Sequence, residues 1–333
     1  MLSGMLFGIG VNTHEEVCMK KLLSLSFLLM TAATQAQEVT PAIKGVVAAG
    51  TRIEFIKEGF QGTEGPITLP DGTLIFTETA ANRLTRIAAD GSTSSWLENT
   101  NGANALAFNR QGELVAVVTG NPKGIAVLYP QDKARLLVDN YQGKPFGRPN
   151  DLVVDKRGGV YFTDPGAPVP AGQPAPATPQ PTAVYYLDPK GQLHLLDSTV
   201  PRPNGIQLSR DEKTLYVNNT FGEYVLAYDI GRDGMVSNRR DFARLEGFRK
   251  TDTGTTSGAD GLAIDAQDRV FVASTAGVQV FSSKGEHLGT IALPKAPQNI
   301  AFAGPGKSTL YIVGRGAAYH ITLLTKGYGG RVK

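Results

Sequence analysis

Apolar and polar residues alternate in short runs along most of the chain beyond residue 40. The runs are rich in β-branched and aromatic residues, as in RLTRI at 83–87 and YVLAY at 224–228. Side chains of a strand point alternately to its two faces, so a period of two residues indicates strands. Asp-Gly and Lys-Gly turn sequences separate many of the runs,. No stretch beyond residue 40 keeps a helical period for long, and the pattern predicts an all-β protein with antiparallel strands.

Six similar segments recur along the chain. They are EGPITLPDG from Glu64, NALAFNRQG from Asn104, NDLVVDKRG from Asn150, NGIQLSRDE from Asn204, DGLAIDAQD from Asp260 and QNIAFAGPG from Gln298. A second predicted strand follows each segment: LIFTE, LVAVV, VYFTD, LYVNN, VFVAS and LYIVG. Units of about 40–50 residues with four short strands are typical of propeller blades. The repeat therefore predicts a six-bladed β-propeller with four-stranded antiparallel blades. A pair of β-sandwiches is the competing fold, but it does not explain six repeats in register.

The sixth repeat is short for a four-stranded blade. We therefore expect residues 42–56 (AIKGVVAAGTRIEFI) to supply its missing strand, so that an N-terminal strand closes the ring. One segment breaks the blade pattern. Residues 165–181 (PGAPVPAGQPAPATPQP) are rich in proline and alanine and cannot form a central strand,. We expect a surface loop within the third blade, or alternatively a lid over the channel mouth.

The first 36 residues have the layout of a secretory signal. Met19, Lys20 and Lys21 give a basic start, residues 22–30 are apolar, and small residues precede a cleavage site expected after Ala36,. The apolar run is too short to span a bilayer. We expect translation to start at Met19, with a longer signal from Met1 as the alternative. The prediction is a signal peptide at 1–36 and one propeller domain at 37–333, in the periplasm or outside the cell.

The composition of the chain limits the classes of partner that it is expected to bind. Removal of 1–36 takes away two basic and two acidic residues, so the formal net charge stays at +3. So small a charge does not suggest a nucleic-acid partner.

The single cysteine of the chain, Cys18, lies within the predicted signal peptide. The four histidines are far apart and outside the repeat register, and the chain has no G-x-S-x-G motif,. We expect no membrane span, and a monomer or a weak homodimer.

The first residue of each repeat carries a side-chain oxygen. Equivalent positions of a propeller form a ring around its axis, so these six side chains should converge at one end of the channel. They are Glu64, Asn104, Asn150, Asn204, Asp260 and Gln298. A ring of oxygens with two carboxylates and no histidine or cysteine favours a hard divalent cation. In the alternative interpretation, the six residues only cap the strand starts, because Asn and Asp favour turns.

Several motifs resemble the senescence marker protein (regucalcin)/gluconolactonase family. They are EGP at 64–66, RPNDLVVD at 148–155, YFTDP at 161–165, PNGIQLS at 203–209, LYV at 215–217, ADGLAID at 259–265 and GVQVF at 277–281. The resemblance implies a six-bladed propeller and, for many members, metal-dependent lactone hydrolysis. It places Glu64, Asn150, Asn204 and Asp260 on metal-binding positions. It also places Asp260 on the catalytic acid/base.

The implied function is metal-dependent hydrolysis of a small, sugar-type lactone. Arg148, by resemblance, and Asn104, in the oxygen ring, are expected to bind the substrate. One divalent ion is expected, Ca²⁺ first, with Mg²⁺, Mn²⁺, Zn²⁺ or Fe²⁺ as alternatives. Thr68, Val118 and Asn219 depart from common bacterial family residues, so the sugar-facing wall is expected to differ. The alternatives are a calcium-stabilised binding propeller without enzyme activity and a strictosidine-synthase-like enzyme. The latter is disfavoured because that chemistry needs an acidic residue that is not a metal ligand.

Overall fold

The computed structural model describes residues 38–167, 181–251, 254–331 and 333. The predicted signal peptide and most of the proline-rich loop lie outside these ranges, so both remain predictions. Within the described ranges no helix is long and apolar enough to cross a bilayer.

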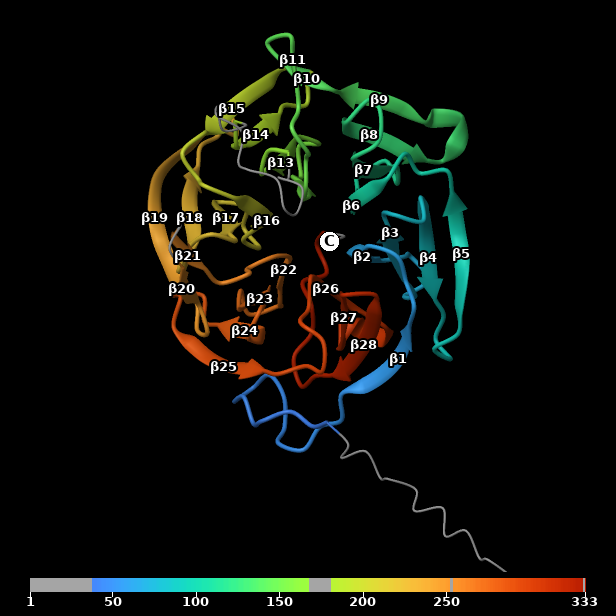
Figure 1. Cartoon of the computed structure of the whole chain (residues 1–333), viewed down its shortest axis with the longest axis vertical. Coiled ribbons are helices and arrows are strands. Elements are labelled where there is room, and N and C mark those ends of the chain that lie inside the picture. Colours follow the sequence, from blue (N-terminus) through green and yellow to red (C-terminus); the bar gives the residue numbers. More distant parts are fainter. Residues whose placement is uncertain (1–37, 168–180, 252–253, 332) are drawn as a thin grey trace, which may run out of the picture. The chain divides into compact units, whose positions relative to one another are not determined.

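Six four-stranded antiparallel sheets are arranged around a central axis, and we call the region along this axis the channel. The prediction of a six-bladed propeller is confirmed (Figure 1). In each blade the strands are given from the channel outwards. The first blade consists of β2 (Thr63–Thr68), β3 (Leu74–Glu78), β4 (Arg83–Ile87) and β5 (Thr93–Glu98), and the second of β6 (Ala103–Phe108), β7 (Leu114–Val118), β8 (Gly124–Tyr129) and β9 (Arg135–Val138). The third blade consists of β12 (Leu152–Val154), β13 (Val160–Asp164), β14 (Ala183–Leu187) and β15 (Leu193–Asp197).

The other three blades have the same strand order. The fourth blade consists of β16 (Pro203–Leu208), β17 (Thr214–Asn219), β18 (Tyr224–Ile230) and β19 (Val236–Arg244), and the fifth of β22 (Leu262–Ile264), β23 (Val270–Ser274), β24 (Gly277–Phe281) and β25 (His287–Ile291). The sixth blade consists of β26 (Asn299–Ala303), β27 (Thr309–Gly314), β28 (Ala317–Thr322) and β1 (Glu54–Glu58). Between blades lie the small hairpins β10 (Asn140–Tyr141) with β11 (Lys144–Pro145), and β20 (Arg249–Thr251) with β21 (Gly254–Thr256). The helical elements are the 3₁₀ turns η1 (Gln131–Lys133) and η2 (Pro305–Lys307).

The hydrophobic core consists of six clusters, each formed by two neighbouring blades. Tyr161 and Tyr186 of the third blade, for example, pack with Ile206 and Tyr228 of the fourth. The second strand of a blade is therefore covered on both faces, and β3, β7, β13 and β23 are buried along their whole length. This burial explains why the second strands were the clearest apolar runs in the sequence.

The N-terminal strand closes the ring, but it is shorter than predicted. β1 pairs antiparallel with β28, from Glu54 opposite His320 to Glu58 opposite Ala317. Residues 42–53, which were also expected to form a strand, contribute only isolated bridges. Gly45 and Gly50 have φ angles of 72° and 75°, so the chain turns at both positions instead of running straight.

The last residues of the chain lie within the channel. Figure 1 shows the C-terminus at the centre of the ring, close to the inner strands. Tyr328 donates its backbone N–H to Ile264 O at 3.2 Å, at the far end of β22. The buried Arg331 side chain donates to Gln207 Oε1 at 3.0 Å, near the end of β16. The tail thus enters the channel from the end at which the inner strands finish.

Candidate functional site

The ring residues lie where the inner strands begin, as the repeat predicted. In the first, second and fourth blades the pairing register shifts at or just after this position, between Glu64 and Ile67, Ala103 and Leu106, and Pro203 and Ile206. An irregularity of this kind interrupts the alternation of side chains and redirects one of them. The irregular strand starts therefore allow several side chains to point into the channel.

Glycines allow neighbouring blades to approach closely behind the ring. A side chain at Gly65, whose φ is 46°, would collide with the backbone carbonyl of Asn104 on the next blade. A side chain at Gly261 would collide with the Asn299 amide. The glycines of EGP and ADGLAID are thus required by packing, and they keep the ring narrow.

Glu64 is buried and held by the sixth blade. Its Oε2 accepts a hydrogen bond from Asn299 Nδ2 at 3.0 Å, and its Oε1 lies 3.4 Å from Gln298 Nε2. Burial raises the pKa of Glu64 to about 7, and the charge of Asp151 adds to the rise. The hydrogen bond from Asn299 and the charge of Arg148 oppose it. A carboxylate in this position would gain from a nearby cation.

Asp260 and Asn204 provide two oxygens without protein partners. Asp260 Oδ1 and Asn204 Oδ1 are buried and accept no hydrogen bond from any described residue. The Asn204 amide is oriented by its Nδ2, which donates to Thr220 Oγ1 at 3.0 Å. Burial raises the pKa of Asp260 well above its ordinary value, and the charge of Glu64 is the next cause. A buried polar atom without a partner is costly, so both oxygens are suited to an added ligand.

Asn104 and Asn150 are linked across two blades. Asn104 Nδ2 donates to the backbone carbonyl of Asn150 at 2.9 Å, which fixes the orientation of the Asn104 amide. Asn150 in turn donates its backbone N–H to Thr163 O of β13 at 2.8 Å. The structure therefore brings together Asn104 with Asn150, Glu64 with Gln298, and Asn204 with Asp260, as neighbouring members of one ring.

Two polar channel residues were missed by the sequence interpretation. Asp151 and Asn299 each follow a ring residue, where the other blades have glycine or alanine. Asp151 Oδ2 accepts a hydrogen bond from Ile206 N at 2.9 Å and lies 2.6 Å from Lys333 Nζ. Lys333 also donates to Ile206 O at 2.7 Å. The tail therefore places an ammonium group directly behind the ring, and both charged side chains are almost fully buried.

Replacement of Lys333 by methionine should destabilise the fold. The variant leaves Asp151 without its buried cationic partner, and a hydrogen bond to a charged group is worth about 1.5–3 kcal/mol. We expect a loss of this size in the free energy of unfolding, measured by urea denaturation. Lys326→Met is the matched control, because the Lys326 side chain is exposed in the same tail. Equal urea midpoints for the two variants would contradict the role given to Lys333.

Arg148 lies at the edge of the ring, in front of Asn150. Asp164, the last residue of β13, positions its backbone: Oδ1 accepts from Arg148 N at 2.9 Å and Oδ2 from Gly147 N at 2.7 Å. The Arg148 side chain is exposed and forms no ion pair with any described carboxylate. A guanidinium that is free of an internal partner is available to a substrate oxygen.

The ring fits a hard cation better than a transition metal. No three His, Cys, Asp or Glu side chains gather into a metal-binding group in the part of the chain that the structure describes. The ring instead combines two carboxylates with amide oxygens, two of its oxygens lack partners among the described residues, and the charge of Glu64 helps to raise the pKa of Asp260. Oxygen-only sites with this charge suit Ca²⁺ or Mg²⁺. Glu64, Asn150, Asn204 and Asp260 are the residues that would hold the ion.

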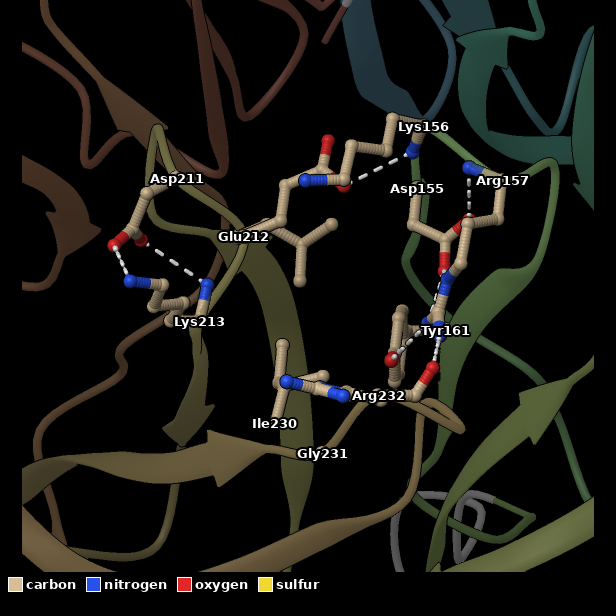
Figure 2. Close-up of a pocket in the computed structure, with 11 residues that line it drawn as sticks. Asp155, Lys156, Arg157, Tyr161, Asp211, Glu212, Lys213, Ile230, Gly231 and Arg232 are labelled. Atoms are coloured by element: carbon tan, nitrogen blue, oxygen red, sulfur yellow. Dashed lines mark hydrogen bonds and ion pairs between the residues drawn. The ribbon is translucent and has the colours of Figure 1, made fainter.

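A hollow lies at the opposite ends of the third and fourth blades, away from the ring. Figure 2 shows its lining, which includes Arg157, Asp155, Lys156 and Glu212, and its volume is about 360 Å³. Arg157 Nη2 pairs with Asp155 Oδ2 at 2.7 Å, and Lys156 N donates to Glu212 Oε2 at 3.0 Å. Its charges are thus largely compensated by one another, and it contains no ring residue. The ring is the stronger candidate for a reactive site.

Comparison with known proteins points to one family. The family described as SMP-30/Gluconolactonase/LRE-like region matches residues 62–315. A gluconolactonase from Zymomonas mobilis is 30% identical over 87% of this chain and 86% of its own length. The solved structure of a gluconolactonase from Xanthomonas campestris is 29% identical, with a TM-score of 0.72, over 86% of this chain and 94% of that chain.

A calcium-binding regucalcin from Agrobacterium tumefaciens has the same fold. It is 19% identical, with a TM-score of 0.68, over 84% of this chain and 96% of that chain. The matched residues include all six ring positions and every blade strand except β28 and the closing strand β1. The chain therefore belongs to the SMP-30/gluconolactonase/LRE-like family.

Proposed function

We propose that this protein is a metal-dependent lactonase that hydrolyses a small, sugar-type lactone at the oxygen ring. The observation that carries the proposal is the pair of buried, unpartnered oxygens on Asn204 and Asp260 beside the Glu64 carboxylate. Such a group is suited to binding a divalent ion, and it lies at the ring expected from the repeat. The gluconolactonases among the relatives support lactones as the substrate class.

The proposed roles follow from the chemistry of each side chain. When bound, a divalent ion in such a site supplies Lewis-acid activation of a carbonyl or a water molecule. Asp260 accepts the proton of the water that attacks the carbonyl and returns it to the ring oxygen of the lactone as the ester C–O bond breaks. Arg148 orients the lactone and stabilises negative charge as it develops on the carbonyl oxygen. Asn104, whose amide is fixed by Asn150 O, contacts the substrate from the other side.

A lactone screen tests the proposal. Purified protein is stripped with a chelator and assayed by pH-stat on five- and six-membered lactones, with Ca²⁺, Mg²⁺, Mn²⁺, Zn²⁺ or Fe²⁺ added singly. We expect turnover of at least one lactone that depends on one of the ions. If every combination were inactive while one ion still raised the melting temperature, the calcium-stabilised binding propeller would be the better account.

Arg148→Ala should separate substrate binding from ion binding. The guanidinium cannot be a metal ligand, so we expect a higher KM or a lower kcat for the lactone and an unchanged ion affinity. Steady-state kinetics give the first quantity and isothermal titration calorimetry the second. A variant with lost ion affinity would show that Arg148 supports the ring itself, and one with wild-type kinetics would remove it from the substrate site.

A further inference from the structure

A second layer of residues lies just in front of the ring, two positions before each ring residue. The layer consists of Gly62, Gly102, Arg148, Arg202, Gly258 and Ala296. Four blades thus have no side chain, or only a methyl group, at this level. The two arginines come from neighbouring blades, the third and the fourth. In this layer the positive charges therefore come from the third and fourth blades alone.

Arg202 is positioned in the same way as Arg148. Asn219, the last residue of β17, accepts a hydrogen bond at Oδ1 from Arg202 N at 3.1 Å, as Asp164 does for Arg148. Asn219 also accepts from Phe221 N at 3.2 Å. The Arg202 guanidinium lies over the Phe221 ring, 5.3 Å from its centre, an arrangement that restricts its orientation. The backbone and the side chain of Arg202 are both held in place.

Neither arginine has an acidic partner within 4 Å among the described residues. Arg202 is partly buried, and burial together with the charge of Arg148 lowers its pKa. The charge of Asp260 opposes this lowering. Two neighbouring guanidinium groups repel each other unless an anion lies between them, and their fork of donors matches a carboxylate or a phosphate.

From this geometry we infer that the lactone substrate carries a separate anionic substituent, a carboxylate or a phosphate, which Arg202 binds together with Arg148. The inference rests on the proposed lactonase function and specifies its substrate class. Two residues of chain span at most about 6–7 Å. This distance is close to the length of a sugar lactone, so a substrate with its carbonyl at the ring would carry its anionic group at the level of the arginines.

Selectivity between neutral and anionic lactones tests the inference. The probes are D-glucono-1,5-lactone, which is neutral, D-glucaro-1,4-lactone, which carries a carboxylate, and 6-phospho-D-glucono-1,5-lactone. We expect the wild type to have a higher kcat/KM for at least one anionic lactone than for the neutral one. In Arg202→Gln the ratio of anionic to neutral kcat/KM should fall at least about tenfold. The anionic probe with the larger fall distinguishes a carboxylate from a phosphate.

The control is Arg52→Gln, which replaces an exposed arginine ahead of β1 and should leave the ratio unchanged. Thermal unfolding of both variants shows whether the fold is intact. A ratio that is unchanged in Arg202→Gln, or a wild type that prefers the neutral lactone, would overturn the inference and leave the proposed lactonase standing.

Calorimetry with D-glucarate, the open-chain dianion, keeps the two proposals separate. We expect the wild type to bind it and Arg202→Gln to bind it at least about tenfold more weakly. If no lactone were hydrolysed, this result would still support the anion site. Wild-type affinity in Arg202→Gln, or no binding in the wild type, would overturn it.

Discussion

Asp260→Asn is expected to lower kcat for lactone hydrolysis by about 100-fold or more, within the usual range for removal of a general base. Asparagine has nearly the same shape as aspartate and keeps one oxygen, but it cannot accept the proton. The backbone carbonyl of residue 260, which accepts from Asn218 Nδ2, is unaffected by the change. Ion binding should therefore persist with lower affinity. Stopped-flow or pH-stat kinetics measure kcat, and calorimetry measures the ion.

Asp241→Asn serves as the control, because this carboxylate is exposed on the outer strand β19. It should have wild-type kinetics. Undiminished hydrolysis by Asp260→Asn would leave the fold and the ion site standing, but it would exclude Asp260 as the base. Asp151 would then be the next carboxylate to test, since it is the other acidic side chain in the channel close to Glu64.

Glu64→Gln should abolish most of the stabilisation that an added ion gives. An ion that binds only the folded state, present at 100 times its Kd, stabilises by about 2.7 kcal/mol. In the variant this gain should nearly vanish, because one of two ring charges is lost. Without an ion the variant should be more stable than the wild type near neutral pH, since it removes a buried carboxylate that is repelled by Asp151 and Asp260. Thermal unfolding with and without Ca²⁺ measures both effects.

The Glu64 carboxyl group also determines how the stability of the metal-free protein changes with pH. The pKa of Glu64 is raised in the fold from 4.5 to about 7, so between these values the folded state holds a proton that the unfolded state has lost. Protonated Glu64 therefore stabilises the metal-free protein below about pH 4.5, and this stabilisation is lost as the pH rises through 7,. Ion binding requires the ionised carboxylate, so the gain from Ca²⁺ should grow over the same interval. Glu64→Gln should lack this part of the pH dependence, and a wild-type slope in the variant would assign it to another group.

The sequence was sufficient for the fold because the same local signals recur six times. VYFTD and VFVAS were predicted as second strands and form β13 and β23 with the same bounds. These strands are buried on both faces between blades, so their apolar character is continuous. The closing strand was predicted too long, because an apolar and β-branched composition alone does not reveal the turns at Gly45 and Gly50.

The ring positions could also be predicted, since equivalent residues of a propeller share one height along the axis. Asp151 and Asn299 could not, because strict alternation places the residue after a ring residue on the other face. Asp151 precedes the first residue of β12 and Asn299 is the first residue of β26, so alternation along the strand does not decide to which side their side chains point. Arg202 could have been found from the repeat, since it stands in the same register as Arg148.

Lys333 had no local signal at all. Its partner Asp151 is remote in the sequence, and their contact exists only because the tail enters the channel. A lone lysine in the last residues reads as a solvated charge, since lysine is rarely buried without a partner. Contacts of this kind require the tertiary structure.

The central claim is that one divalent ion in the oxygen ring is needed for lactone hydrolysis. The most direct test titrates Ca²⁺, or the most active ion from the lactone screen, into chelator-stripped protein while the hydrolysis rate is followed. We expect the rate to rise from near zero and to saturate at one ion per chain, and we expect Glu64→Gln to prevent this rise. Full turnover in stripped protein, or the same titration curve in Glu64→Gln, would contradict it.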